Sequence, residues 1–161
     1  MNTLPQLLEE DMGELDLALR ELLFHSEASL ALLIDKGGFL ITLCGEDPLA
    51  LDTTTLAALS AASFAATQGI ALLVGETNFS SVYQQGEHHS LLVLNVDEFC
   101  LLAIVFQAHL SVGAVKYYAA GTVKQIAGQL KKAHQRAPQF GLDLSLMDLA
   151  DPAPLFRKQV A

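Results

Sequence analysis

The feature that most constrains the fold is a long stretch without any charged side chain, Thr53 to Gly75 (TTTLAALSAASFAATQGIALLVG). Asp52 is a residue type that caps helix N-termini, and Gly75 is one that ends helices, so the pattern predicts one helix between them. Residues at helical spacing predict a stripe that faces a core. They are Leu56, Leu59, Ser63, Ala66, Ile70 and Leu73.

A second stripe on the same helix consists only of small residues: Ala58, Ala62, Ala65 and Gly69. It lies about 100° further round the helix, where small side chains would let another backbone approach closely. A helix without charges and with two apolar faces should be covered on more than one side. Two interpretations remain open: burial inside a monomer, or contact with a second subunit or another partner.

Composition sets limits on the class of protein. A chain of 161 residues predicts one domain, residues 1–136, followed by a C-terminal tail, residues 137–161, that docks on the domain or on a partner. Hydrophobic content is 52% and charged content 17%. No uninterrupted apolar run approaches the roughly 18 residues of a membrane span. The apolar excess therefore predicts protein–protein surface, and the acidic N-terminus, which lacks a secretory pattern, predicts a cytoplasmic protein.

Net charge also limits the partners. The formal net charge is −9, which argues against nucleic acid or an anionic membrane as the primary partner. The two cysteines, Cys44 and Cys100, lie in apolar runs and are expected to be buried, reduced thiols rather than a disulfide.

Two further helices are predicted, one on each side of the strand-forming segments. The first covers Leu4 to Phe24, with Pro5 in its first turn and a leucine stripe toward the core. The last covers Val112 to about His134, and Pro138 and Gly141 are expected to stop it. Its predicted buried face is Val115, Tyr118, Ala119, Val123, Ile126, Ala127 and Leu130.

Five strands are predicted between these helices. Ala28–Leu43 is a hairpin that turns at Asp35-Lys36-Gly37-Gly38, and Ser90–Val96 and Phe99–Gln107 form a second hairpin. Asn78–Gln85 is short and polar, which is typical of a sheet edge. Because the other strands are apolar without alternation, both faces of the sheet must be covered. The expected fold class is α+β, with a five-stranded antiparallel sheet that has one helix on one face and two on the other.

No constellation in the sequence indicates catalysis. The five histidines lack the spacing of a metal site, and neither cysteine has the exposed, electropositive setting of a nucleophile. Phosphate-binding, dinucleotide-binding and nucleophile-elbow motifs are absent from the sequence. We therefore expect a non-catalytic protein without cofactor or metal.

Several segments, by their order and spacing, resemble the roadblock/dynein light chain family, and within it the bacterial polarity and gliding-motility regulators. They are ALLIDKGGFLI (Ala31–Ile41), FAATQ (Phe64–Gln68), VGETNF (Val74–Phe79), QGE (Gln85–Glu87), NVDE (Asn95–Glu98), LAIVF (Leu102–Phe106) and GAVKYYA (Gly113–Ala119). Phe64 is bulkier than expected in the middle of the central helix.

The resemblance implies a profilin-like αββαβββα sandwich that forms a homodimer. The central helices would pack together, and the short third strands, here Ser81, Val82 and Tyr83, would pair across the two-fold axis. The implied partner is a Ras-like small GTPase of the MglA type, whose GTP hydrolysis such proteins stimulate. The implied dimer and GTPase interface is Ala58, Ala62, Ala65, Ala66 and Gly69.

The resemblance also implies a mechanism without an arginine finger, in which the dimer reshapes the switch loops of the GTPase. The only arginines are Arg20, Arg136 and Arg157, and none lies on the central helix. A roadblock scaffold that tethers a GTPase complex without altering nucleotide turnover is the alternative. An enzyme or small-molecule sensor would need a polar pocket, which these aliphatic strands do not predict.

Overall fold

Three helices and five strands follow one another in the predicted order. The computed structural model describes residues 3–46 and 49–140. Within them the elements are α1 (Glu9–Ser26), β1 (Leu30–Asp35), β2 (Leu40–Gly45), α2 (Thr53–Leu73), β3 (Ser81–Gln85), β4 (His89–Asn95), β5 (Cys100–Gln107) and α3 (Val112–Phe140). The predicted tail therefore begins inside α3, and the rest of it, residues 141–161, lies outside the described residues.

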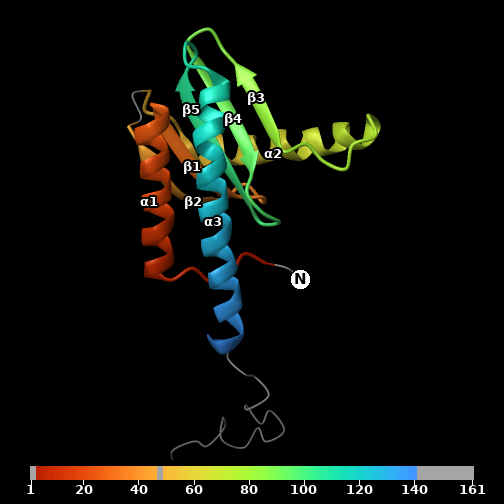
Figure 1. Cartoon of the computed structure of the whole chain (residues 1–161). Helices are drawn as coiled ribbons and strands as arrows, with labels where there is room; N and C mark the ends of the chain where they lie inside the picture. The colour runs from red at the N-terminus through yellow and green to blue at the C-terminus, as the bar shows by residue number, and fades with distance from the viewer. Residues whose placement is uncertain (1–2, 47–48, 141–161) are drawn as a thin grey trace, which may run out of the picture.

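The five strands form one antiparallel sheet in the order β2-β1-β5-β4-β3. In Figure 1, α1 and α3 run side by side over one face of this sheet, and α2 crosses the other face. The two central strands, β1 and β5, are buried on both faces, which explains why their sequences are apolar without alternation. The predicted α+β class is confirmed, as is the prediction of one helix on one face of the sheet and two helices on the other.

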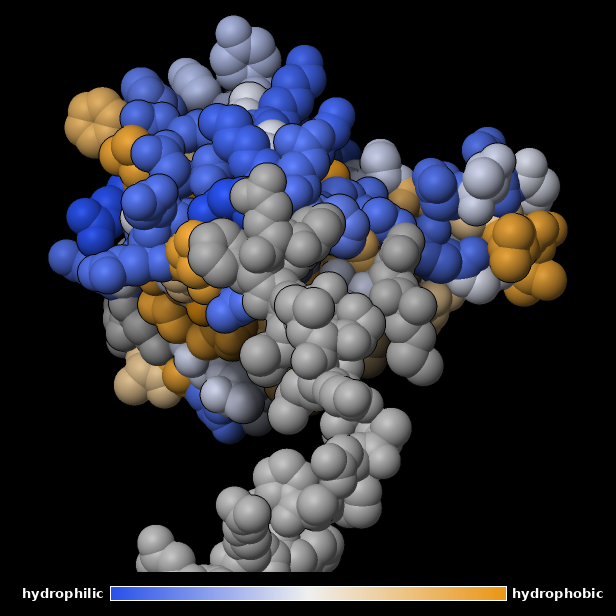
Figure 2. Space-filling model, turned by 90° about the horizontal axis from the view of Figure 1, so that it is seen from below, coloured by the Kyte–Doolittle hydropathy of each residue, from blue (hydrophilic) through white to orange (hydrophobic). Residues whose placement is uncertain are grey.

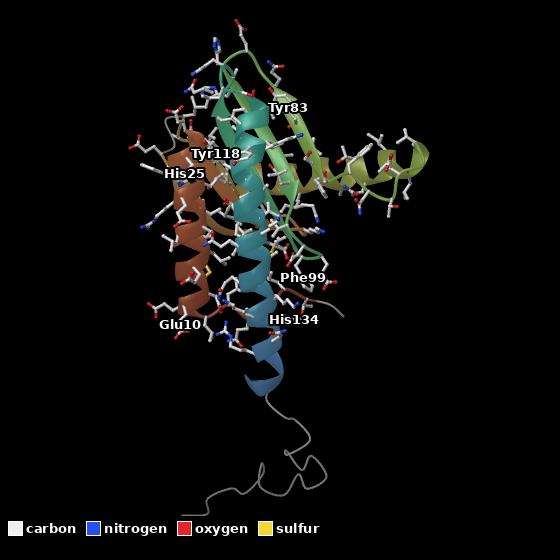
Figure 3. All side chains as sticks on the ribbon, viewed as in Figure 1. Glu10, His25, Tyr83, Phe99, Tyr118 and His134 are labelled. Carbon is white, nitrogen blue, oxygen red and sulfur yellow. The ribbon has the colours of Figure 1, made fainter. Side chains whose placement is uncertain are left out.

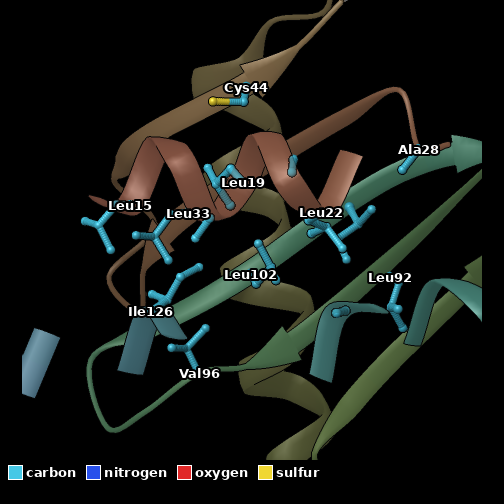
Figure 4. Packing of buried hydrophobic residues seen from close by; sticks show 14 of the residues in the cluster. Leu15, Leu19, Leu22, Ala28, Leu33, Cys44, Leu92, Val96, Leu102 and Ile126 are labelled. Atoms are coloured by element: carbon cyan, nitrogen blue, oxygen red, sulfur yellow. The ribbon is translucent and has the colours of Figure 1, made fainter. Parts of the chain in front are cut away.

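The core between the sheet and the helix pair is built mainly from leucines and isoleucines (Figure 4). Leu15, Leu19 and Leu22 of α1 are buried against Leu33 and Leu102 of the central strands. Each fully buried side chain of this kind contributes about 1.5–3 kcal/mol. The leucine spacing of α1 therefore fixes which side of the helix faces the sheet.

α1 begins at Glu9, five residues later than the predicted start at Leu4, and the reason is Asp11. Its buried carboxylate accepts the backbone N–H of Leu8 at 2.8 Å, which caps the helix there. It also accepts the Gln129 amide at 2.6 Å and forms an ion pair with Arg136, both on α3. Burial works to raise the pKa of Asp11, but these hydrogen bonds and the charge of Arg136 outweigh it and lower the pKa from its ordinary value.

α2 begins and ends as predicted. The Asp52 carboxylate accepts the backbone N–H of Thr55 at 3.0 Å and the Thr55 hydroxyl at 2.6 Å, as an N-cap does. At the other end Gly75 has φ +80°, and the Glu76 and Gly75 amides donate to the Ala71 and Leu72 carbonyls at 2.9 and 3.3 Å. This is the Schellman arrangement, which favours glycine.

The predicted core stripe of α2 is wrong. The buried residues of α2 are Ala57, Ser60, Ala61, Phe64 and Ala71, and of the predicted stripe only Leu56 packs, partly buried, against the sheet cluster. Phe64 packs with Leu32 and Val93 in the core between α2 and the sheet. The aromatic ring that was bulkier than expected therefore holds the helix on the sheet. The buried residues belong to neither predicted stripe, so the contact with the sheet decides which face of this apolar helix is buried.

α3 is longer than predicted and is rotated slightly from its predicted face. It continues to Phe140, beyond the predicted end near His134 and through Pro138. Val115, Ala119, Ile126 and Leu130 are buried as predicted, but Tyr118 is exposed. Ala133 is also buried and extends the buried face toward the C-terminal end of the helix.

Candidate functional site

The candidate site is the solvent-facing side of α2. In Figure 1 the C-terminal half of α2 extends past β3, the edge of the sheet, and forms a projecting arm. Figure 2 shows hydrophobic side chains gathered at the tip of this arm, where Leu72, Leu73 and Val74 are exposed. A helix without charges that leaves the sheet carrying apolar side chains presents a surface suited to another protein.

The length and composition of α2 bear on the expectation that no segment of the chain spans a membrane. α2 is 21 residues long and contains an 18-residue stretch with a mean hydropathy of 1.6, so its length and composition alone would be enough to cross a membrane. Only 28% of that stretch is buried. Since Phe64 and Ala61 pack on the sheet, α2 is a core helix of this fold.

All five residues predicted to form the dimer and GTPase interface lie on the exposed part of α2. They are Ala58, Ala62, Ala65, Ala66 and Gly69. Nothing lies within 4 Å of the position that a Gly69 Cβ would take, so this part of the stripe is open. Ala58 differs, because Gly38 of the β1–β2 turn (φ +95°) would place a Cβ 3.1 Å from its Cα. The β1–β2 turn thus already packs closely against Ala58 within the same chain.

Sequence reasoning missed a second exposed row that runs beside the small-residue stripe. Leu59, Ile70 and Leu73, predicted to be core, are exposed to 63%, 50% and 87%. Their side chains add bulk to a surface that would otherwise offer only alanines and glycine. The absence of charge around the whole helix is the signal that could have revealed it, because a helix that is apolar all round has more than one face to cover.

The edge strand β3 offers a second kind of contact next to the arm. Ser81, Val82 and Tyr83 lie on this strand, as predicted, and within the described residues only β4 pairs with it. The Asn95 amide donates to the Ser80 carbonyl at 3.0 Å and the Gly86 amide to the His89 carbonyl at 3.0 Å. Because antiparallel pairs alternate, residues 82 and 84 bond to β4, and the N–H and C=O of Ser81, Tyr83 and Gln85 face outward.

The arm is fastened to this edge by one side chain. The Gln68 amide donates to the Phe79 carbonyl, 3.0 Å away, so the loop into β3 is tied to the middle of α2. Between them lies a groove of about 600 Å³ that Phe64, Ala65 and Leu101 line together with polar side chains such as Asn95 and Asp97. The helix, the groove and the strand edge therefore form one continuous surface.

The arginines lie away from this surface, whereas Lys36, Asp97 and Glu98 line the groove beside the helix. Arg20 lies on α1 and Arg136 on α3, both on the opposite face of the sheet, and Arg136 is paired with Asp11. Among the described residues, no arginine lies on the α2 face. Arg157 lies outside the described residues.

The thiols and histidines do not assemble a reactive centre. Both cysteines are free and buried, as predicted. Burial, followed by the charges of Asp97 and Asp35, raises the pKa of Cys100 to about 12, and burial also raises the pKa of Cys44. Across residues 3–46 and 49–140 no group of three or more His, Cys, Asp or Glu side chains could hold a metal ion.

Comparison with known proteins identifies the type of fold. The model of the roadblock/LC7 domain family matches residues 14–106. Among solved structures, one described as MglB with a tetrameric arrangement is 31% identical, with a TM-score of 0.76, and the match covers 83% of this chain and 99% of that one. The gliding protein MglB of Thermus thermophilus is 30% identical, with a TM-score of 0.75 and coverage of 82% and 99%.

More distant matches support the same fold. Myxococcus xanthus MglB is 27% identical, with a TM-score of 0.73, and the match covers 80% of this chain and 96% of that one. Profilin IA of Acanthamoeba castellanii is 12% identical, with a TM-score of 0.50 and coverage of 71% and 97%, and shares the fold alone. No curated protein is similar enough to this chain to count as a match.

Proposed function

Because this chain belongs to the roadblock/LC7 domain family, we propose that it is a homodimeric regulator that binds a Ras-like small GTPase of the MglA type and stimulates its GTP hydrolysis. It is an MglB-like roadblock protein, and no catalytic family is indicated for it. On this proposal it acts in the cytoplasm, in the control of cell polarity or gliding motility. The observation that carries the proposal is the uncharged arm of α2 beside the unpaired edge of β3.

The dimer follows from the combination of arm and edge. A second copy related by a two-fold axis would pair its Ser81, Tyr83 and Gln85 backbone groups with the same groups here and continue the sheet. The projecting half of α2 would then lie over the partner's sheet instead of in water. One contact would then give hydrogen-bond partners to the backbone groups of the edge and remove the apolar side chains of the arm from water.

The GTPase would dock on the outer surface of the paired helices. Ala62, Ala65 and Gly69 leave no bulky or charged side chain there, which allows close approach of another backbone. The described arginines lie on the far side of the sheet, so this surface offers no arginine to the phosphates, and the cation beside it is Lys36 of the groove. We therefore propose that stimulation comes from stabilising a switch-loop conformation in which the GTPase's own residues reach the nucleotide.

The test replaces two small residues with large cations, Ala65→Arg and Gly69→Arg. Both positions are exposed, so the chain should fold, while GTPase binding and stimulated phosphate release should be lost; light scattering shows whether the dimer contact of the same helix is lost with them. The matched control is Ala120→Arg with Gly128→Arg on the exposed side of α3, which should leave both activities intact. Stimulated hydrolysis that survives the α2 substitutions would show that the surface is assigned wrongly.

The same assay separates activation from scaffolding. Phosphate release by the cognate GTPase is measured with and without the unmodified protein, next to a binding measurement. Binding with an unchanged rate of phosphate release would favour the tethering scaffold over the activator.

A further inference from the structure

We propose that four aromatic side chains at the junction of α1 and α3 form a docking surface for the proline-containing end of this same chain, residues 152–156 (PAPLF). We call the four side chains the aromatic row: Phe24, His25, Tyr118 and Tyr117. The row lies on the helix-pair face of the sheet, opposite α2, so it is separate from the proposed dimer and GTPase surface.

The rings of the aromatic row follow one another without a gap. Phe24 meets His25 edge to face at 5.3 Å, His25 stacks on Tyr118 at 5.8 Å, and Tyr118 meets Tyr117 edge to face at 5.2 Å between centroids. Figure 3 shows His25 of α1 and Tyr118 of α3 at the same level on the two neighbouring helices. The row therefore bridges the helix pair, and residues distant in sequence form one continuous surface.

Three of these rings are exposed to solvent although they form one contiguous group. Phe24, Tyr117 and Tyr118 are exposed to 82%, 75% and 40%. Isolated exposed apolar residues are ordinary, whereas a contiguous group indicates a binding surface. Next to Phe24 the surface is hollowed by about 400 Å³, lined also by Leu23, Ala28 and Glu46. A ligand would find ring faces on one side and an apolar hollow on the other.

The chemistry of the row suits an extended segment that contains proline. Such a segment has a fixed φ at each proline and no internal hydrogen bonds, so its carbonyls remain free to accept. Aromatic faces pack against the proline rings, and the two tyrosine hydroxyls and the imidazole can donate to the free carbonyls. Rows of aromatic side chains bind proline-rich segments for these reasons.

This chain supplies such a segment itself. Asp151-Pro152-Ala153-Pro154-Leu155-Phe156 places two prolines and an aromatic residue within six positions, and Arg157 and Lys158 follow. The cations would lie close to the acidic side chains around Phe24, among them Glu27 and the Glu46 of the hollow. The prolines of this segment suit the aromatic row, and its cations suit the acidic side chains beside the row, so both features favour this segment as the occupant.

The length of the chain allows the contact. Along α3, the 22 residues from Tyr118 to Phe140 rise about 33 Å at 1.5 Å each. The 12 residues from Phe140 to Pro152 reach about 40 Å at 3.3 Å each when extended. The prolines can therefore return to the aromatic row of their own chain, and an extended path is required.

The experiment uses the full chain with a nitroxide attached through Ala161→Cys, and follows the ring signals of Tyr117 and Tyr118 by NMR. Both native cysteines are buried and should not take the label. We expect the two ring signals to lose most of their intensity while Phe64, buried on the opposite face of the sheet, keeps its own. Pro152→Ala with Pro154→Ala should restore the lost intensity, and Leu142→Ala with Leu144→Ala should not.

Two further measurements test the aromatic row itself and identify the segment that occupies it. Phe24→Ala should restore the Tyr118 signal, whereas the matched control Phe39→Ala, exposed on the β1–β2 turn, should leave it reduced. Unaltered Tyr117 and Tyr118 signals, or a loss that persists without the prolines, overturn the proposal. Loss that appears only when labelled and unlabelled chains are mixed assigns the row to a second copy and overturns docking within one chain.

Discussion

Truncation of Leu73 at the tip of the α2 arm gives the most direct measure of the proposed dimer. Leu73 is 87% exposed in the isolated chain, so almost all of its side chain is available to a partner. Leu73→Ala removes three carbon groups, each worth about 0.8 kcal/mol when buried. A partner that covers the exposed part would lose about 2 kcal/mol per protomer.

The symmetry of the interface doubles this effect. In a two-fold dimer the substitution occurs once in each subunit, so the total loss is about 4 kcal/mol. Since 1.4 kcal/mol corresponds to tenfold in an equilibrium constant, the dissociation constant of the dimer should rise about a thousandfold. Leu17→Ala, on the exposed side of α1, removes the same groups on the other face and should change nothing.

Analytical ultracentrifugation over a range of concentrations measures the dissociation constant of each variant. The control is the thermal unfolding temperature at a concentration where all variants are monomeric. Leu73→Ala should leave this temperature unchanged because the Leu73 side chain makes few contacts within its own chain. An unchanged dissociation constant for Leu73→Ala would refute the assignment of the arm to the dimer contact. A raised constant for Leu17→Ala would place the contact on the helix pair instead.

Three other predictions concern the free energy of unfolding, measured by urea denaturation. Phe64→Ala should cost about 3–5 kcal/mol because the ring is buried on the sheet, whereas the exposed Phe39→Ala should cost under about 0.5 kcal/mol. Asp11→Ala should cost about 3 kcal/mol at neutral pH. Because the folded-state pKa of Asp11 is lowered, its contribution is present above pH about 4 and is lost as the pH falls further, so the variant and the unmodified chain should converge in acid. Gly75→Ala should cost about 1–2 kcal/mol because φ is positive there, and Gly69→Ala, inside the helix with open space around it, should instead stabilise by about 0.5–1 kcal/mol.

Local chemistry was sufficient to give the order of the elements and both ends of α2. Asp52 and Gly75 mark the two ends of α2, because an N-cap carboxylate and a glycine with positive φ act within a few residues of the chain. The continuous apolar strands required a sheet covered on both faces, and the uncharged helix required cover on more than one side. The order of the elements then led to the α+β sandwich, and the order and spacing of matching sequence segments led to the roadblock/LC7 family.

Tertiary structure decided which faces are buried. Periodicity could not identify the buried face of α2, which is apolar all round, and the sheet packs on Ala61 and Phe64, outside both predicted stripes, while Leu59 and Ile70 remain exposed. The start of α1 depended on the buried carboxylate of Asp11, whose partners lie more than a hundred residues away on α3. The exposure of Tyr118 likewise follows from the contact between α1 and α3. These outcomes depend on long-range packing, which helical spacing in the sequence does not specify.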